Sequence, residues 1–210
     1  MPSETVPIEP RDSRRTAVRE FKRRLIQDAA KQIFADHGIE AASMREIALA
    51  AGYSTGLIYA YFKTKEELYA EILRDSLDAL YEAMVATTGS KTGQRAVAAL
   101  RGLWDFYTQR PADFDLGFYL HGGARPAGLT RDLDHELNAL LDRVMIHIGE
   151  CLVSDGLSTP KKAHHQAVAY ATSLFGLLLM TRTGRIKSVR EEPELVLNTF
   201  LRAVTQKTPK

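Results

Sequence analysis

Residues 43–68 read SMREIALAAGYSTGLIYAYFKTKEEL, and this stretch decides the fold. Ser43 and Glu46 have the spacing of a capping box, in which two side chains satisfy backbone N–H groups at the start of a helix. Apolar residues then recur at helical spacing as far as Gly52, a residue type that readily takes the left-handed conformation that ends helices. The pattern predicts a short helix that begins after Ser43 and ends at Gly52.

A second short helix follows almost at once. Ser54 is placed to cap a helix over residues 54–62. Thr64 and Glu67 form another S/T-x-x-E capping box, which predicts a long helix from there to about Val85. Within 54–62 we expect outward-facing side chains at Ser54, Thr55, Gly56, Tyr59, Ala60 and Tyr61, and buried ones at Leu57, Ile58 and Phe62.

Upstream, apolar residues at helical spacing predict a helix over about 18–37, which Gly38 ends. Three short helices, with a tight glycine-containing turn between the last two, form a helix-turn-helix. A helix has about the width of the major groove of DNA. Residues 54–62 are therefore predicted to be a recognition helix that presents side chains to base edges.

The remainder shows no strand-like alternation, so the predicted fold class is all-α. Further helices are expected over 93–109, 111–122, 130–154, 160–184 and 192–206, separated by stretches that contain glycine and proline. We expect three parts. They are a flexible basic arm over residues 1–16, an N-terminal three-helix helix-turn-helix domain over 17–66, and a larger C-terminal helical bundle over 67–210.

The composition indicates a folded intracellular protein. Of the 210 residues, 45% are hydrophobic, which is enough to bury a core. The one cysteine, Cys151, excludes an internal disulfide framework and a cysteine-based zinc site. Met1–Pro10 lacks the apolar run of a signal peptide, and the longest apolar run, Leu174–Met180, is too short to cross a bilayer. We expect a soluble, cytoplasmic protein.

The charge is unevenly distributed. The chain carries a net charge of only +2, but Arg11–Arg24 holds seven Lys and Arg residues against two acidic ones. A short basic block near a terminus often contacts nucleic acid, because neutralised phosphates release counterions. Taken alone, the block is equally compatible with a merely soluble tail.

A resemblance to a known family becomes specific at this point. Residues 51–68 are similar to the signature of the tetracycline-repressor (TetR) family, A-G-hydrophobic-S-x-G-x-hydrophobic-Y-x-Y-F-x-S/T-K-E-x-L. Residues 33–38 and 43–48 resemble the end of the family's first helix and its second helix. Tyr53 stands where the family usually has valine and Thr55 where it often has lysine, and both changes bear on base preference.

The resemblance implies that eight residues bind DNA. They are Arg45, Ser54, Thr55, Gly56, Leu57, Tyr59, Tyr61 and Lys65. Thr55, Gly56 and Leu57 match base-proximal places at the front of the recognition helix. Tyr59, Tyr61 and Lys65 match places that contact phosphates, and Arg45 matches one that reaches the groove or the backbone. The alternatives are that the two tyrosines are packing aromatics, that Arg45 pairs only with Glu46 or Asp36, and that Lys65 is a solubility charge.

The resemblance also implies that the bundle dimerises and binds a small hydrophobic or amphipathic effector. The last two helices, about 160–184 and 192–206, carry small and apolar residues that favour close helix packing between two copies. The alternative is that these residues form the core of one copy. Candidate effector contacts are Trp104, Tyr107, Phe114, Phe118, His121, Met145, His147 and Phe175, with ordinary core packing as the alternative for each.

The predicted function is that of a sequence-specific DNA-binding transcriptional regulator, as the resemblance implies. We expect a homodimer on double-stranded DNA with a pseudopalindromic operator, acting as a repressor that an effector releases by tilting the fourth helix. We predict neither a cofactor nor a metal site, since the adjacent His164 and His165 point about 100° apart on a helix. An enzyme built on Cys151 and His147 is a weaker hypothesis, because no phosphate loop or catalytic motif accompanies them. A helix-turn-helix that binds only protein is a third.

Overall fold

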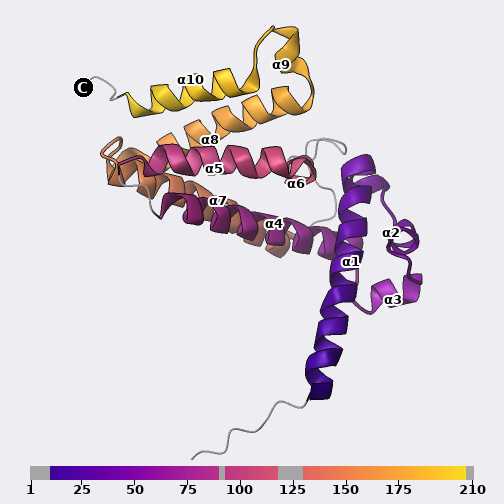
Figure 1. Ribbon diagram of the computed structural model, residues 1–210. Coiled ribbons are helices and arrows are strands. Elements are labelled where there is room, and N and C mark those ends of the chain that lie inside the picture. Colours follow the sequence, from indigo (N-terminus) through magenta and orange to yellow (C-terminus); the bar gives the residue numbers. More distant parts are fainter. Residues whose placement is uncertain (1–9, 90–92, 118–129, 207–210) are drawn as a thin grey trace, which may run out of the picture. The chain divides into compact units, whose positions relative to one another are not determined.

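The computed structural model describes residues 10–89, 93–117 and 130–206, and within these ranges the regular structure is entirely helical (Figure 1). This confirms the all-α prediction. The helices are α1 (Pro10–Ala41), α2 (Met44–Ala51), α3 (Thr55–Tyr59), α4 (Lys65–Thr88), α5 (Arg95–Gln109), α6 (Pro111–Gly117), α7 (Arg131–Ser154), α8 (Pro160–Arg182), α9 (Arg185–Ser188) and α10 (Pro193–Thr205). None of these described helices has the length and hydropathy that a membrane span requires.

The described chain divides into two compact units, a head (residues 10–72) and a body (residues 73–117 and 130–206). The division falls inside α4, six residues later than the predicted boundary after residue 66. The first turns of α4 belong to the head because their apolar side chains are buried there. Tyr69, for example, is 2% exposed and meets the Phe34 ring of α1 edge-on, with ring centroids 5.7 Å apart.

Helix α1 begins at Pro10, so the prediction of a flexible arm over residues 1–16 is wrong for 10–16; residues 1–9 lie outside the described chain. Proline is tolerated in the first turn of a helix, where its missing N–H would have no intrahelical partner. No glycine or proline follows Pro10 before Gly38. Gly38 has φ +77° and ψ 164°, which is not the predicted left-handed helical conformation, and it kinks α1, which continues to Ala41 rather than ending at Gly38. The extra turns are exposed, and the buried face of α1 starts only at Ile26.

The caps of the short helices are as predicted. The Ser43 side chain accepts a hydrogen bond from the Glu46 N–H, and the Glu46 carboxylate accepts one from the Ser43 N–H, at 3.2 and 2.9 Å. Gly52 ends α2 with φ +73°. The Ser54 hydroxyl accepts a hydrogen bond from the Leu57 N–H at 3.3 Å and so caps α3. These contacts are local, which explains why the spacing of the residues predicted them.

The second predicted capping box forms only in part. The Thr64 hydroxyl accepts a hydrogen bond from the Glu67 N–H at 3.1 Å, as expected. The Glu67 carboxylate, however, accepts its hydrogen bond from the Lys63 N–H at 2.8 Å, one residue before the predicted donor. Helix α4 still begins where the pattern places it, because both carboxylate and hydroxyl satisfy backbone groups at its N-terminus.

In the body, α5, α7 and α8 pack together, and α10 packs against α5 and α8 (Figure 1). Their shared core includes Leu100, Leu103, Trp104, Val144, Ile148, Leu152, Ala167, Ala171, Leu174, Leu197 and Leu201. Helix α6 is tied to α8 by an ion pair in which Arg182 Nη2 donates to the buried Asp115 carboxylate at 2.6 Å. The four-residue α9 was not predicted from the sequence; it follows Gly184 (φ +71°) and buries Ile186.

Candidate nucleic-acid interface and effector site

The recognition helix α3 presents nearly the face that the sequence predicts. Tyr59 is 52% exposed, whereas Ile58 and Phe62 are buried. Ser54, Gly56 and Ala60 are exposed, and Thr55 and Tyr61 are half-buried. Leu57 was expected to be buried but is only half-buried. Its apolar atoms are therefore partly available to a partner.

Gly56 is open to the outside. A Cβ added at this residue meets no atom within 4 Å, and the backbone has no positive φ that would demand glycine. The fold of the head therefore does not explain a glycine at this position.

Arg45 is exposed on α2, and within the described chain neither of the expected carboxylates pairs with it. The Glu46 carboxylate is held by Ser43, whose hydrogen bonds lower the pKa of Glu46. Asp36 accepts hydrogen bonds from Gln32 at 3.2 and 3.3 Å. The structure thus leaves the Arg45 guanidinium accessible from solvent.

Lys65 makes hydrogen bonds that the sequence did not predict. Its Nζ donates hydrogen bonds to the backbone carbonyls of Glu40 and Ala42, each at 2.9 Å. These carbonyls follow the Gly38 kink at the end of α1. The ammonium therefore ties the α1–α2 connection to the start of α4, and it keeps one further N–H for another acceptor.

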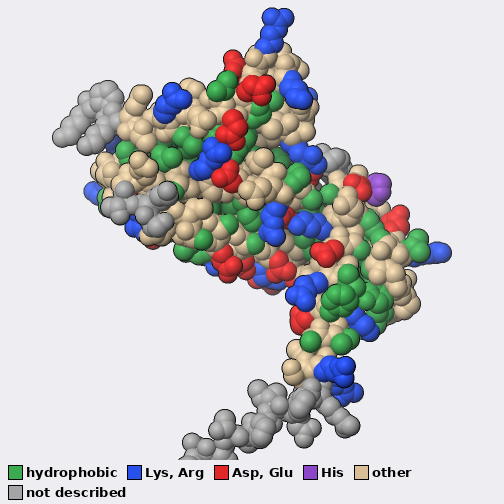
Figure 2. Space-filling model, viewed as in Figure 1, with side chains coloured by type: hydrophobic (Ala, Val, Ile, Leu, Met, Phe, Trp, Pro, Cys, Tyr) green, Lys and Arg blue, Asp and Glu red, His purple; other side chains and the backbone are tan. Residues whose placement is uncertain are grey.

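The exposed N-terminal turns of α1 form a basic surface, visible as blue side chains at the lower end of α1 (Figure 2). Arg14, Arg15, Arg19 and Arg24 are exposed there. The Arg19 guanidinium lies 6.0 Å from the centroid of the Tyr61 ring, which joins this surface to the end of α3. Helix α1 thus carries Arg14 and Arg15, which the sequence assigned to a flexible arm, together with Arg19 and Arg24 of the predicted helix.

Among the candidate effector contacts, three aromatic residues pack on one another in the body. The Tyr107 ring lies 5.5 Å from the Phe114 ring and 6.2 Å from the Phe175 ring, measured between centroids. Burial, with the charge of Asp113, raises the pKa of Tyr107. Trp104 is buried and its indole N–H donates to Glu194 at 3.3 Å. Phe118 and His121 lie outside the described residues.

His147 joins α7 to α4. Its Nε2 lies 3.2 Å from the Thr88 hydroxyl, and its ring meets the Tyr81 ring at 5.6 Å. Burial lowers the pKa of His147, with Arg95 contributing, and burial raises the pKa of the Cys151 thiol to about 11. The Cys151 Sγ lies 3.8 Å from Nε2. A thiol that stays protonated is a poor nucleophile, which argues against a catalytic pair.

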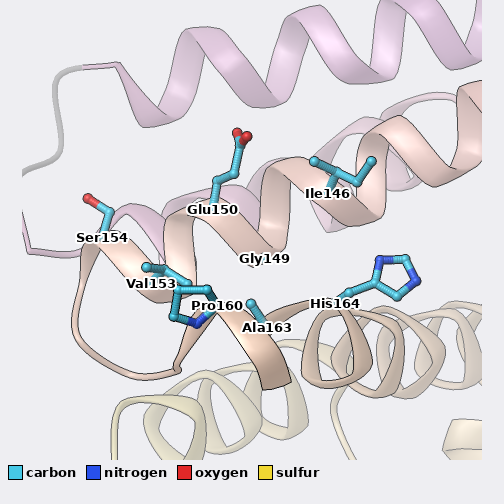
Figure 3. A pocket seen from close by; sticks show the side chains of 8 residues that line it. All are labelled: Ile146, Gly149, Glu150, Val153, Ser154, Pro160, Ala163 and His164. Carbon is cyan, nitrogen blue, oxygen red and sulfur yellow. The ribbon is translucent and has the colours of Figure 1, made fainter.

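Two hollows open between α7 and α8. The larger is about 460 Å³ and is lined by Ile146, Gly149, Glu150, Val153, Ser154, Pro160, Ala163 and His164 (Figure 3). The smaller is about 270 Å³ and is lined by Asn138, Leu141, Asp142, Met145, Val168, Ala171, Thr172 and Phe175. The smaller hollow contains two predicted residues, Met145 and Phe175. The larger hollow contains none of the predicted residues. It lies where α7 and α8 approach each other closely at Gly149 and Ala163, and the sequence gives no sign of that helix contact.

The Asp142 and His164 side chains connect the two hollows. Asp142 lines the smaller and His164 the larger, and Asp142 Oδ1 lies 3.7 Å from His164 Nε2. Among the described residues, no three His, Cys, Asp or Glu side chains are close enough together to hold a metal ion.

The last long helices expose a second surface. Ala169, Ser173 and Gly176 of α8 and Thr199 and Ala203 of α10 are exposed, as is Leu195 at 62%. Many of the small and apolar residues of these two helices are instead part of the core of one copy. They are Ala167, Ala171, Leu174, Leu177, Leu197 and Leu201.

Comparison with known proteins agrees with this architecture. The sequence model of "Bacterial regulatory proteins, tetR family" matches residues 26–72. The chain is 47% identical over 57 residues to the HTH-type transcriptional repressor KstR2 of Mycolicibacterium smegmatis, covering 27% of each chain. It is 39% identical over 92 residues to the HTH-type transcriptional activator FasR of the same organism, covering 42% of this chain and 41% of FasR. The matches thus span well under half the length of these relatives.

Solved structures resemble the chain over most of its length. Regulatory protein SCO4313 superimposes with a TM-score of 0.75 at 22% identity, covering 93% of this chain and 98% of that one. The regulator FadR from Bacillus subtilis, solved in complex with stearoyl-CoA, gives a TM-score of 0.70 at 16% identity, covering 88% and 98%. At these identities the likeness shows the fold. Residues 26–72, which include the capped helices and the α3 signature, match the tetR family of bacterial regulatory proteins, and the whole described chain has the fold of these regulators.

Proposed function

We propose that the protein is a sequence-specific DNA-binding transcriptional regulator of the cytoplasm that represses its target genes until a small molecule releases it. The observation that carries the proposal is the outer face of α3, where Tyr59 is exposed and Gly56 leaves open space on a TetR-family head. KstR2 is named a repressor and FasR an activator, so the relatives that this chain is similar to include both kinds of regulator.

In this proposal α3 enters the major groove. Thr55, Gly56 and Leu57 approach the base edges, since they lie at the N-terminal end of α3. Tyr59, Tyr61 and Arg45 contact phosphates and hold the helix in register. Lys65 uses its third N–H for a phosphate at the N-terminus of α4, where the helix dipole also favours an anion.

The basic turns of α1 add contacts to the DNA backbone. Arg14, Arg15 and Arg19 are exposed on one regular helix, so their spacing is fixed before binding. Each phosphate that an arginine neutralises releases counterions and makes binding more dependent on salt.

The functional unit is a homodimer formed through α8 and α10. The exposed small residues Ala169, Ser173 and Gly176 allow two copies of α8 to approach closely, and the exposed Leu195 supplies apolar area. Such a dimer places two recognition helices about one DNA turn, ~34–36 Å, apart on a pseudopalindromic operator.

The effector is a hydrophobic or amphipathic molecule that binds between α7 and α8. The larger hollow has the size and apolar lining of small-molecule sites, which run from about 300 to 1,000 Å³. The smaller hollow adds Met145 and Phe175. The structural likeness to a regulator solved with stearoyl-CoA supports a ligand with an apolar chain.

Long side chains connect α7 to α4. Arg74 donates to the Glu136 carboxylate at 2.7 and 2.9 Å, Arg143 pairs with Asp78, and His147 meets Thr88. An effector that moves α7 therefore pulls on α4, whose first turns belong to the head. It lowers DNA affinity only by as much as it prefers the arrangement that does not bind DNA.

Selection of duplexes from a random DNA pool with the full-length protein tests the proposal. We expect enrichment of a pseudopalindrome whose half-sites are separated by about 10–10.5 base pairs. Binding at low salt without any enriched sequence would contradict operator recognition, and no binding at all would favour a head that contacts only protein.

The effector site has its own test. Stearoyl-CoA is the first probe, and we expect it to release the selected DNA. Val153→Trp fills the larger hollow and Thr172→Trp the smaller, and at least one should abolish release while DNA affinity stays unchanged. Release that both variants leave intact would place the effector elsewhere.

A further inference from the structure

Arg23 of α1 and Glu71 of α4 form an ion pair inside the head. Arg23 Nε donates to Glu71 Oε1 at 2.6 Å, and Arg23 Nη2 donates to Oε2. Gln27, one turn further along α1, donates to the same Oε1 at 2.9 Å. The side chains are only 27% and 16% exposed. Both carboxylate oxygens are thus engaged, and the guanidinium is held in a defined plane.

The face of that guanidinium covers Phe62. The Arg23 Cζ lies 4.6 Å from the centroid of the Phe62 ring, within the range of a cation–π contact. Phe62 is 1% exposed and lies three residues after the end of α3. Its N–H bonds to the carbonyl of Ile58 at 2.9 Å, which continues the turn of the recognition helix.

A five-residue helix has no stable orientation of its own, because isolated helices this short do not persist in water. The direction of α3 is therefore set by its anchors, and Ile58 and Phe62 are the two buried ones near its end. The Arg23 guanidinium covers one face of the buried Phe62 ring, and its hydrogen bonds to Glu71 hold the guanidinium in that position. A lysine at this position would supply the charge without the planar, bidentate fit.

We propose that Arg23 and Glu71 are positioning residues for DNA recognition: the pair, stacked on Phe62, sets the orientation of α3, and Arg23 acts through Phe62 rather than on a phosphate. The inference rests on the proposed function, since it concerns the same recognition helix.

Glu71→Gln gives a decisive test because charge and position predict opposite results. Removal of a carboxylate from a DNA-binding head should tighten binding if only charge matters. Loss of the positioning pair should instead weaken binding to the selected site about tenfold, about 1.4 kcal/mol, and leave binding to unrelated DNA nearly unchanged. Glu20→Gln is the matched control, since Glu20 is an exposed carboxylate on α1. It should show the charge effect alone.

Arg23→Gln separates positioning from phosphate contact through salt dependence. A phosphate contact contributes about 0.9 to the slope of log affinity against log salt. We expect Arg23→Gln to weaken specific binding as much as Glu71→Gln with the slope unchanged, and the double variant to be no weaker than either single one. Arg15→Gln, on the exposed turns of α1, should lower the slope.

Arg23→Lys is a second variant that keeps the positive charge, so the test does not depend on the folding of Arg23→Gln alone. If Arg23 is a positioning residue, Arg23→Lys should bind the selected site more weakly, with an unchanged slope of log affinity against log salt. Thermal unfolding verifies that each variant is folded at the temperature of the titration. A lowered slope for Arg23→Gln, or tighter specific binding by Glu71→Gln, would overturn the inference. If the unmodified protein selects no sequence, the proposed function fails first, and that result is distinct from either outcome.

Discussion

The ammonium of Lys65 donates a hydrogen bond to the carbonyl of Ala42 at 2.9 Å, and a second to the carbonyl of Glu40 at the same distance. The resemblance to the family implies that this lysine contacts DNA, but within the head its ammonium also satisfies backbone carbonyls at and just after the end of α1. We expect Lys65→Ala to lower the free energy of unfolding by about 1–2 kcal/mol, because two backbone acceptors lose their charged donor.

Thermal unfolding of the full chain measures this loss, with Lys63→Ala as the exposed control. If Lys65→Ala has the same unfolding midpoint temperature as the unmodified protein, the two hydrogen bonds of the ammonium do not stabilise the fold.

Gly56→Ala should separate stability from DNA binding. A Cβ at this position meets nothing within 4 Å, and alanine favours a helix, so we expect equal or slightly higher thermal stability. The methyl group would occupy space between α3 and the DNA, and we expect about tenfold weaker binding to the selected operator. Fluorescence anisotropy with a labelled duplex checks this; unchanged affinity would mean that the DNA does not approach the α3 backbone.

Tyr59→Phe should weaken binding to every sequence to a similar extent, by about two- to tenfold, because it removes one hydroxyl contact to phosphate. Tyr59 is 52% exposed, so the change should leave the fold intact. Affinities for the operator and for single-base variants of it provide the measurement.

Thr55→Ala is the contrasting variant. Thr55 lies in the first turn of α3, and we expect its loss to change preference at particular base pairs. A uniform loss with Thr55→Ala, or a shifted preference with Tyr59→Phe, would reverse the roles assigned to the two residues.

Gly176→Arg should dissociate the dimer. Gly176 is exposed on α8 with open space around it, so one copy tolerates a side chain that two packed copies do not. Light scattering should report a monomer, and affinity for the full operator should fall with it. Ala139→Arg on the exposed face of α7 is the control. A Gly176→Arg variant that stays dimeric would place the interface away from this part of α8.

His147 should make stability depend on pH. Burial lowers its pKa in the folded protein, so the folded state binds a proton less readily than the unfolded chain does. Stability is then fully present above the unfolded pKa, about 6.5, and falls as the pH drops through the lowered, folded value. His147→Gln should flatten the fall in thermal stability between about pH 7 and pH 5. His135→Gln, an exposed histidine of α7, is the control, and an equal flattening there would exclude His147 as the cause.

The sequence alone determined the short helices of the head. Ser43 with Glu46, Gly52, and Ser54 act on backbone groups three or four residues away, so their spacing was sufficient. The same local logic was misapplied at the N-terminus. The arm predicted over residues 1–16 is helical from Pro10 onward, because proline fits the first turn of a helix.

Tertiary structure decided what distant residues do. The Arg23–Glu71 pair joins residues 48 apart in the chain, and the Lys65 contacts join residues 23 and 25 apart. The larger hollow depends on the contact between α7 and α8 at Gly149 and Ala163, and no local sequence pattern predicts that contact. Periodicity tells which side of a helix is apolar, but not which other helix will cover it. Helix type and helix ends were therefore readable in the sequence, while the partners of Arg23 and Lys65 and the place of the hollows required the folded chain.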